Sequence, residues 1–221
     1  MKLDSVLFDL DGTLLQTADD LGDALNYVLA KHDMPLVDAK AYTPEASNGS
    51  RGLLELGFGD KLKNYDFESL KQQLLQYYGE NIAIKTDYFP QVAETLSLLN
   101  EQNIPWGIVT NKPEFLTLPL VKHFKLLDEC QVVISGDTVG VAKPDPKPMR
   151  FALEKLAMPA ETCLYVGDAK RDIEAGKNTN MPTAAAFYGY ISEGDDPNLW
   201  QADFNLETFG QLIEVMNLNK S

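Results

Sequence analysis

Three carboxylates in this chain each follow a short apolar run. Asp9 and Asp11 come directly after residues 6–8, and Asp168 comes just after residues 164–166. Side chains two residues apart in an extended segment point the same way, so Asp9 and Asp11 are expected to converge. Clustered carboxylates need a cation or a proton, and hard oxygen ligands favour Mg²⁺. Taken alone, Asp9 and Asp11 also fit a simple acidic turn.

Groups suited to a phosphoryl ligand occur at other strand ends. They are the hydroxyl of Thr110, the backbone N–H of Asn111 and the ammonium of Lys143. Hydrogen bonds from such donors to phosphate oxygens are strong. A carboxylate beside them can act as a nucleophile and form an aspartyl-phosphate. A second carboxylate can protonate the leaving alcohol and then deprotonate the attacking water.

The elements that must position these groups alternate between strand and helix. Apolar runs that predict buried strands lie at residues 2–9, 106–109, 132–134, 164–166 and 183–187. Helical spacing separates them, which favours α/β architecture with a doubly wound parallel sheet. Ligands bind such sheets beyond the carboxyl ends of the strands. Asp9, Thr110 and Asp168 are therefore expected at one edge.

Residues 17–84 contain no strand-like run. Helical patterns lie at about 17–33, 38–45, 50–56 and 67–82, and residues 47–52 have loop chemistry. We therefore expect a helical cap domain at 17–84, inserted into a catalytic core of residues 1–16 and 85–221. In the core, Pro119 predicts a kink or break in its helix, and a final helix is expected at about 206–217.

Composition limits the class of partner. Acidic residues outnumber basic ones by 33 to 19, for a net charge of −14. This argues against nucleic acid, and any anion site must be built locally. The two cysteines predict no disulfide framework, no stretch approaches the roughly 18 apolar residues of a membrane span, and no signal-peptide pattern is seen. We expect a soluble cytoplasmic protein, a monomer or homodimer, with a small-molecule partner.

Four motifs then resemble those of the haloacid dehalogenase-like (HAD) hydrolases in order and in spacing. They are Asp9-Leu10-Asp11-Gly12-Thr13, Thr110, Lys143-Pro144 and Gly167-Asp168 with Asp172. The resemblance spans about residues 1–190. It implies a Rossmann-like core with a helical cap. It also implies that Asp9 is the nucleophile, that Asp11 is the general acid/base, and that Thr110 and Lys143 hold the phosphoryl group.

The resemblance further implies Mg²⁺ bound by Asp9, the backbone carbonyl of Asp11 and Asp168. Asp172 would be an accessory acid that orients metal waters or Lys143. Dehalogenating relatives lack an acid two residues after the nucleophile, so Asp11 favours phosphate-ester hydrolysis or a phosphomutase reaction over C–Cl cleavage. A non-catalytic binding module is disfavoured because the motifs are intact.

The overall pattern looks most like the phosphoglycolate phosphatase-like branch, which implies a small carboxylated phosphate monoester. Residues 188–191 and 196–203 are instead similar to N-acetylmuramic acid 6-phosphate phosphatases. A β-phosphoglucomutase-like phosphomutase is a further alternative. In the cap loop, Asn48 and Arg51 would face the site, and Arg51 could pair with a substrate carboxylate or be merely solvated.

Several other residues receive structural interpretations. Lys112 is expected to be solvated rather than to bind phosphate, and His32 and His123 are expected to be structural. Trp106 is expected in the core. Trp200 is expected either over the site rim or against the sheet edge.

Overall fold

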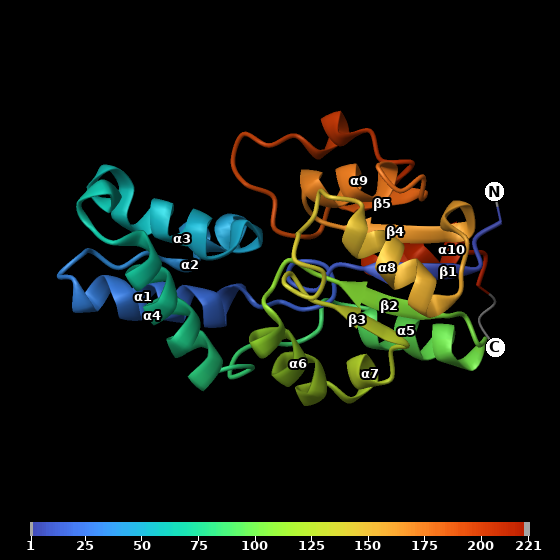
Figure 1. The fold of residues 1–221 in the computed structure, drawn as a ribbon, viewed down its shortest axis with the longest axis horizontal. Helices are drawn as coiled ribbons and strands as arrows, with labels where there is room; N and C mark the ends of the chain where they lie inside the picture. The colour runs from blue at the N-terminus through green and yellow to red at the C-terminus, as the bar shows by residue number, and fades with distance from the viewer. Residues whose placement is uncertain (1, 219–221) are drawn as a thin grey trace.

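A six-stranded parallel sheet forms one half of the molecule (Figure 1). The computed structural model describes residues 2–218; Met1 and residues 219–221, assigned above to the core, lie outside the described residues. The strand order is β3-β2-β1-β4-β5-β6, and every neighbouring pair is parallel. The strands are β1 (Ser5–Phe8), β2 (Trp106–Val109), β3 (Val132–Ile134), β4 (Cys163–Gly167), β5 (Thr183–Ala186) and β6 (Phe204–Leu206). The predicted α/β class with a doubly wound sheet is confirmed.

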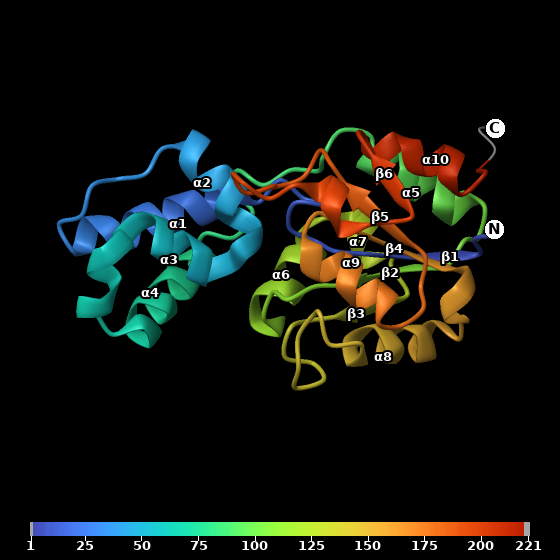
Figure 2. The ribbon, with the colours of Figure 1, turned by 90° about the horizontal axis from the view of Figure 1, so that it is seen from above.

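Helices cover both faces of this sheet. They are α5 (Val92–Glu101), α6 (Glu114–His123), α7 (Lys125–Asp128), α8 (Lys147–Leu156), α9 (Lys170–Lys177) and α10 (Leu212–Val215). Figure 2 shows α5 and α10 on one side of the sheet and α8 on the other. Alternate residues of β1 serve the two faces, since Phe8 packs with Trp106 and Phe209 while Leu7 packs with Met149. Trp106 is fully buried, as expected.

A second group of helices lies beyond the sheet, at the left of Figure 1. It contains α1 (Ala18–Lys31), α2 (Ala39–Glu45), α3 (Gly49–Phe58) and α4 (Phe67–Glu80). Their apolar faces pack on one another through residues such as Leu25, Leu53 and Leu74. The ring of His32 lies among Phe58 and Tyr65, in agreement with its structural interpretation.

Two chain crossings, which are the connecting segments around Gln16 and around Asp87, join the helical group to the sheet. They are hydrogen-bonded to each other. The N–H of Gln16 donates to the carbonyl of Asp87 at 2.8 Å, and the N–H of Phe89 donates to the carbonyl of Leu14 at 3.1 Å. Leu15 and Tyr88 form an antiparallel bridge between them. The crossings therefore form a short two-stranded ribbon.

A buried carboxylate of the helical group binds the second of these segments just before the ribbon. Asp20, in the first turn of α1, accepts hydrogen bonds from the N–H of Lys85 and from the N–H and hydroxyl of Thr86. Three donors thus compensate a carboxylate that is 4% exposed.

The predicted C-terminal helix is confirmed only over Phe209–Val215, where the 3₁₀ helix Phe209–Gln211 leads directly into α10. Residues 206–217 do not form one helix, because Phe204–Leu206 pair with β5 as the edge strand β6, and α10 spans only Leu212–Val215. Leu206, Phe209 and Leu212 are all buried at a spacing of three, which imitates a helical face. Pro119 lies within α6 and does not break it.

Both cysteines are free, which agrees with the sequence. Between residues 2 and 218, no helix combines the length and apolarity that crossing a bilayer requires.

Candidate active site

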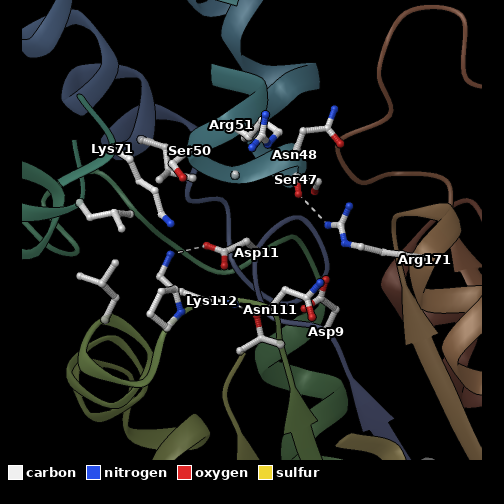
Figure 3. Close-up of a pocket in the computed structure, with 17 residues that line it drawn as sticks. Asp9, Asp11, Ser47, Asn48, Ser50, Arg51, Lys71, Asn111, Lys112 and Arg171 are labelled. Atoms are coloured by element: carbon white, nitrogen blue, oxygen red, sulfur yellow. Dashed lines mark hydrogen bonds and ion pairs between the residues drawn. The ribbon is translucent and has the colours of Figure 1, made fainter. Parts of the chain in front are cut away.

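Three adjacent strands end at the same edge of the sheet. β1 leads into Asp9, β2 into Thr110 and β4 into Asp168, and these strands are neighbours in the order β2-β1-β4. The edge faces the loop between α2 and α3 (Figure 3). A cavity of about 430 Å³ lies between them. Of the predicted site residues, it is lined by Asp9, Asp11, Asn48, Arg51, Thr110 and Asn111.

Lys143, the lysine predicted for the site, lies behind this cavity and contacts Asp9, which lines it. The Lys143 ammonium lies 2.9 Å from Asp9 Oδ1 and 2.8 Å from Asp172 Oδ1. It also donates to the carbonyl of Val109 and to the hydroxyl of Tyr165. Its side chain is fully buried. A buried ammonium with this many partners fixes the carboxylate that it contacts.

Asn111 positions Lys143 through the backbone. Its side-chain oxygen accepts from the N–H of Lys143 at 2.9 Å, and its amide donates to the Lys143 carbonyl at 3.0 Å. The peptide bond between Lys143 and Pro144 is cis. The hydroxyl of Thr110 accepts from the N–H of Lys112 at 3.2 Å, and α6 begins only at Glu114, so Thr110 does not cap that helix.

Asp9, Asp168 and Asp172 form a buried carboxylate cluster. One oxygen from each lies within 4.8 Å of the others. Burial, together with Asp9 and Asp172, raises the pKa of Asp168 to about 7. Burial also raises the pKa of Asp9, although Lys143 acts in the opposite direction. The cluster carries more negative charge than Lys143 offsets, and its oxygens suit a hard divalent cation.

Asp168 is held by neutral donors from three segments. The hydroxyl of Thr13 donates to Oδ1 at 3.2 Å, and the hydroxyl of Ser47 and the N–H of Tyr190 donate to Oδ2 at 2.6 and 2.9 Å. The φ of Gly12 is +81°, and a Cβ there would overlap the Asp168 carboxylate. Glycine is therefore required at this turn.

Lys112 was wrongly expected to be solvated. It is 9% exposed, and its ammonium lies 2.9 Å from Asp11 Oδ1 and 4.2 Å from the centre of the Tyr78 ring. Burial opposes its charge, but Asp11 and Tyr78 raise the pKa of Lys112 above its usual value. Lys112 therefore belongs to the site.

Asn48 and Arg51 line the cavity, but the loop predicted for residues 47–52 is not found: Asn48 ends a 3₁₀ turn and Arg51 lies in the first turn of α3. Both side chains already have partners. The Arg51 guanidinium lies 3.4 Å from Glu55 Oε1 and stacks over Phe67. The Asn48 amide donates to Glu45 at 2.8 Å and to the Ser192 hydroxyl at 2.9 Å.

Arg171 is a lining residue that the sequence reasoning missed. It lies in the first turn of α9, and its Nη2 donates to the carbonyl of Ser47 at 2.6 Å. The available signal was its place between Asp168 and Asp172 in the fourth motif. Asp172 itself also accepts from the N–H of Ala169 and so caps α9.

Two residues lie away from the cavity lining. Trp200 packs with Ile173 and Ala185 against the sheet, which selects the second of its two expected positions. His123 packs edge-on against Phe124 and is structural as expected.

Comparison with known proteins gives a consistent family. The model of the haloacid dehalogenase-like hydrolase family matches residues 6–186. A Pseudomonas aeruginosa protein named N-acetylmuramic acid 6-phosphate phosphatase is 35% identical over 217 residues, covering 98% of this chain and 96% of that protein. A Xanthomonas campestris pv. campestris protein named phosphoglycolate phosphatase is 38% identical over 210 residues, covering 95% of each. The crystal structure of a predicted phosphoglycolate phosphatase from Haemophilus somnus 129pt superposes with a TM-score of 0.87 at 25% identity, covering 97% of this chain and 98% of that chain.

Proposed function

Because this chain belongs to the haloacid dehalogenase-like hydrolase family, we propose that it is a Mg²⁺-dependent phosphatase of a small carboxylated phosphate monoester. The observation that carries the proposal is the position of Asp9. Its carboxylate lies on the cavity floor, 2.9 Å from the buried ammonium of Lys143 and inside the carboxylate cluster. A fixed carboxylate beside a cation is suited to nucleophilic attack on phosphorus.

The reaction has two steps. An oxygen of Asp9 forms a bond to phosphorus, the ester P–O bond breaks, and Asp11 gives its proton to the departing alcohol oxygen. In the second step a water oxygen forms a bond to phosphorus, Asp11 takes a proton from that water, and the bond between phosphorus and the Asp9 oxygen breaks, which releases inorganic phosphate and restores Asp9. Thr110, the N–H of Asn111 and Lys143 hold the phosphoryl oxygens in both steps.

The donor set fits Mg²⁺, with Asp9, the carbonyl of Asp11 and Asp168 as the residues that hold it. The ion supplies charge neutralisation to the phosphoryl oxygens when it is bound. Asp172 acts through Lys143, whose ammonium it contacts at 2.8 Å.

The cap of this enzyme is residues 17–84, over a core of residues 1–16 and 85–221. Asn48, at the end of the 3₁₀ turn before α3, and Arg51, in the first turn of α3, contact the leaving group. Two observations support this division: both residues line the cavity, and Ser47 beside them already touches Asp168.

The substrate is either phosphoglycolate or N-acetylmuramic acid 6-phosphate, since relatives with both names are similarly identical to this chain. The cavity volume favours the second candidate. About 430 Å³ lies within the range of roughly 300–1,000 Å³ typical of pockets for larger organic ligands. A two-carbon acid leaves much of that space to water, whereas an amino sugar with an acidic ether substituent fills more of it.

A hydrolysis screen with Mg²⁺ tests these proposals. We expect Asp9→Asn to abolish release of phosphate from every ester, and Asp4→Asn, at the half-buried start of the same strand region, to retain it. A preference of more than about tenfold in kcat/KM between the two candidate esters, about 1.4 kcal/mol, decides between them.

Two results would contradict the proposal. Appreciable turnover by a folded Asp9→Asn variant would exclude the aspartyl-phosphate route. Conversion of a sugar phosphate to its isomer without release of phosphate would instead identify a phosphomutase.

A further inference from the structure

We propose that Arg171 is the specificity-determining residue that binds the carboxylate of the substrate's leaving group. The inference rests on the proposed phosphatase function and names a residue outside the catalytic motif positions assigned above. Arg171 extends from α9 toward the cavity, opposite Lys112 and Lys71 (Figure 3).

Arg171 has an incomplete set of partners. Within residues 2–218 it makes one hydrogen bond, from Nη2 to the Ser47 carbonyl, and no ion pair. A guanidinium has five N–H donors in a rigid fork, so most of its donors remain available. Such a fork matches the two oxygens of a carboxylate.

Each of the other cations that line the cavity has a carboxylate partner in the protein, in exposed pairs for Arg51 and Lys71 and in a shielded pair for Lys112. Lys112 pairs with Asp11 at 2.9 Å, Arg51 with Glu55 at 3.4 Å, and Lys71 with Glu68 at 3.3 Å. Arg171 is the one lining cation, among the described residues, that lacks such a partner. A carboxylated substrate would supply it.

Arg171 keeps its charge in this position. Burial opposes the charge, but Asp172, Asp9 and Asp168 raise the pKa of Arg171 above its usual value. A leaving-group carboxylate beside Arg171 would form an ion pair with this guanidinium, and a neutral leaving group on the same phosphate would not.

A purely structural role makes a different prediction. If Arg171 only holds the Ser47 carbonyl, and with it the cap loop, its loss would affect all esters in proportion. If it binds the leaving-group carboxylate, its loss would affect the discrimination between charged and neutral leaving groups. When a substrate lacks the group that the buried donors of a site bind, those donors stay unpaired and the site discriminates strongly against that substrate.

Matched ester pairs separate these roles. One pair is phosphoglycolate and its neutral amide, and the other is N-acetylmuramic acid 6-phosphate and N-acetylglucosamine 6-phosphate, which lacks the lactyl carboxylate. We would measure kcat and KM for both members with Mg²⁺ for the wild type, Arg171→Met and Arg171→Lys. Lys170→Met, which removes the exposed neighbouring charge paired with Glu174, is the control.

We expect the acid-over-neutral ratio of kcat/KM to fall about 100-fold in Arg171→Met, mainly through KM, as for a site that loses hydrogen bonds to its ligand. Arg171→Lys should keep part of the ratio, since it keeps the charge without the fork, and Lys170→Met should keep all of it. In an Asp9→Asn background, which stops turnover, calorimetric titration with the acid should show the same loss of affinity on adding Arg171→Met.

Three results would overturn the inference while the phosphatase function stands. They are a proportional loss on both members of a pair, a wild type that does not distinguish them, and a selective loss in Arg51→Met instead of Arg171→Met. Absence of turnover of every ester by folded wild type would overturn the proposed function and this inference together.

Discussion

The ammonium of Lys112 lies 2.9 Å from Asp11 Oδ1, in a contact that is largely shielded from water. Tyr78 of α4 covers the same ammonium with the face of its ring. The proposed general acid/base is therefore held by a core lysine, and that lysine is covered by a helix of the proposed cap. The orientation of Asp11 depends on both parts of the molecule.

We expect Lys112→Met to lower kcat about 100-fold. General acid–base catalysis contributes a rate factor of about this size, and it requires that the side chain of Asp11 be held in position. Lys112→Arg should retain part of the rate. The double variant Lys112→Met/Asp11→Asn should be no slower than Asp11→Asn alone, since both changes remove one function. Steady-state kinetics on an alkyl phosphate, with Lys122→Met on α6 as control, measure this. Multiplicative losses in the double variant would show that Lys112 acts independently of Asp11.

The raised pKa of Asp168 predicts a pH dependence of the metal-free protein. The folded state keeps a proton that the unfolded state loses above its ordinary pKa of 3.8. The contribution of Asp168 to stability is thus greatest at low pH and is lost as the pH rises through about 7. The proposed Mg²⁺ would bind the ionised carboxylate, so its stabilising effect should grow over the same interval.

Thermal unfolding at pH 5.5 and pH 8, with EDTA or with Mg²⁺, checks this expectation. The Tm increase caused by Mg²⁺ should be larger at pH 8. Asp168→Asn should reduce both the pH dependence and the Mg²⁺ response, and the exposed Asp60→Asn should leave them intact. An equal Mg²⁺ effect at both pH values would exclude Asp168 as the titrating ligand.

Gly12 and Gly140 offer a matched pair of substitutions. Their φ values are +81° and +78°, but only at Gly12 would a Cβ meet the Asp168 carboxylate, since nothing lies within 4 Å of one at Gly140. Each change to alanine should cost about 1–2 kcal/mol of unfolding free energy for the backbone conformation. Gly12→Ala alone should also lose most activity and the Tm response to Mg²⁺. Equal behaviour of the two variants would be inconsistent with the close approach.

Substitutions of Asp20 and Asp23 test which interactions hold the second chain crossing to α1. Asp20→Ala leaves two buried donors of Thr86 and the partly buried N–H of Lys85 without their acceptor, and we expect a loss of about 3 kcal/mol in urea unfolding. Asp23→Ala removes only an exposed ion pair with Lys85 and should cost less than about 1 kcal/mol. A similar cost for both would show that the buried hydrogen bonds of Asp20 add little.

The strand ends could be predicted because their signals are local. Each of Asp9, Thr110 and Asp168 directly follows an apolar run, and parallel topology brings such ends together. Lys112 could not be predicted as part of the site, because its partner Asp11 lies 101 residues away. The edge strand β6 has three residues, too few for alternation to outweigh the helical spacing around it.

The part of the cavity lined by residues 47–51 was predicted as a location but not in detail. Residues 47–51 do face the site, yet the contacts of Ser47 with Asp168 and Arg171 join segments more than 120 residues apart. No periodicity in the sequence encodes them. Arg171 lies in the fourth motif between Asp168 and Asp172, which are the residues with recognisable roles. An arginine in the first turn of a helix has no sequence pattern that predicts ligand binding.

The ribbon of Gln16 and Asp87 has a mechanical consequence. Two separate connections would let the helical group twist as well as tilt relative to the sheet. Connections that are bonded to each other and fastened by Asp20 are expected to restrict such motion to bending about one axis. The contact of Ser47 with Asp168 and the position of Tyr78 over Lys112 then depend on the same registration of the helices on the sheet. We therefore expect both contacts to form or break together.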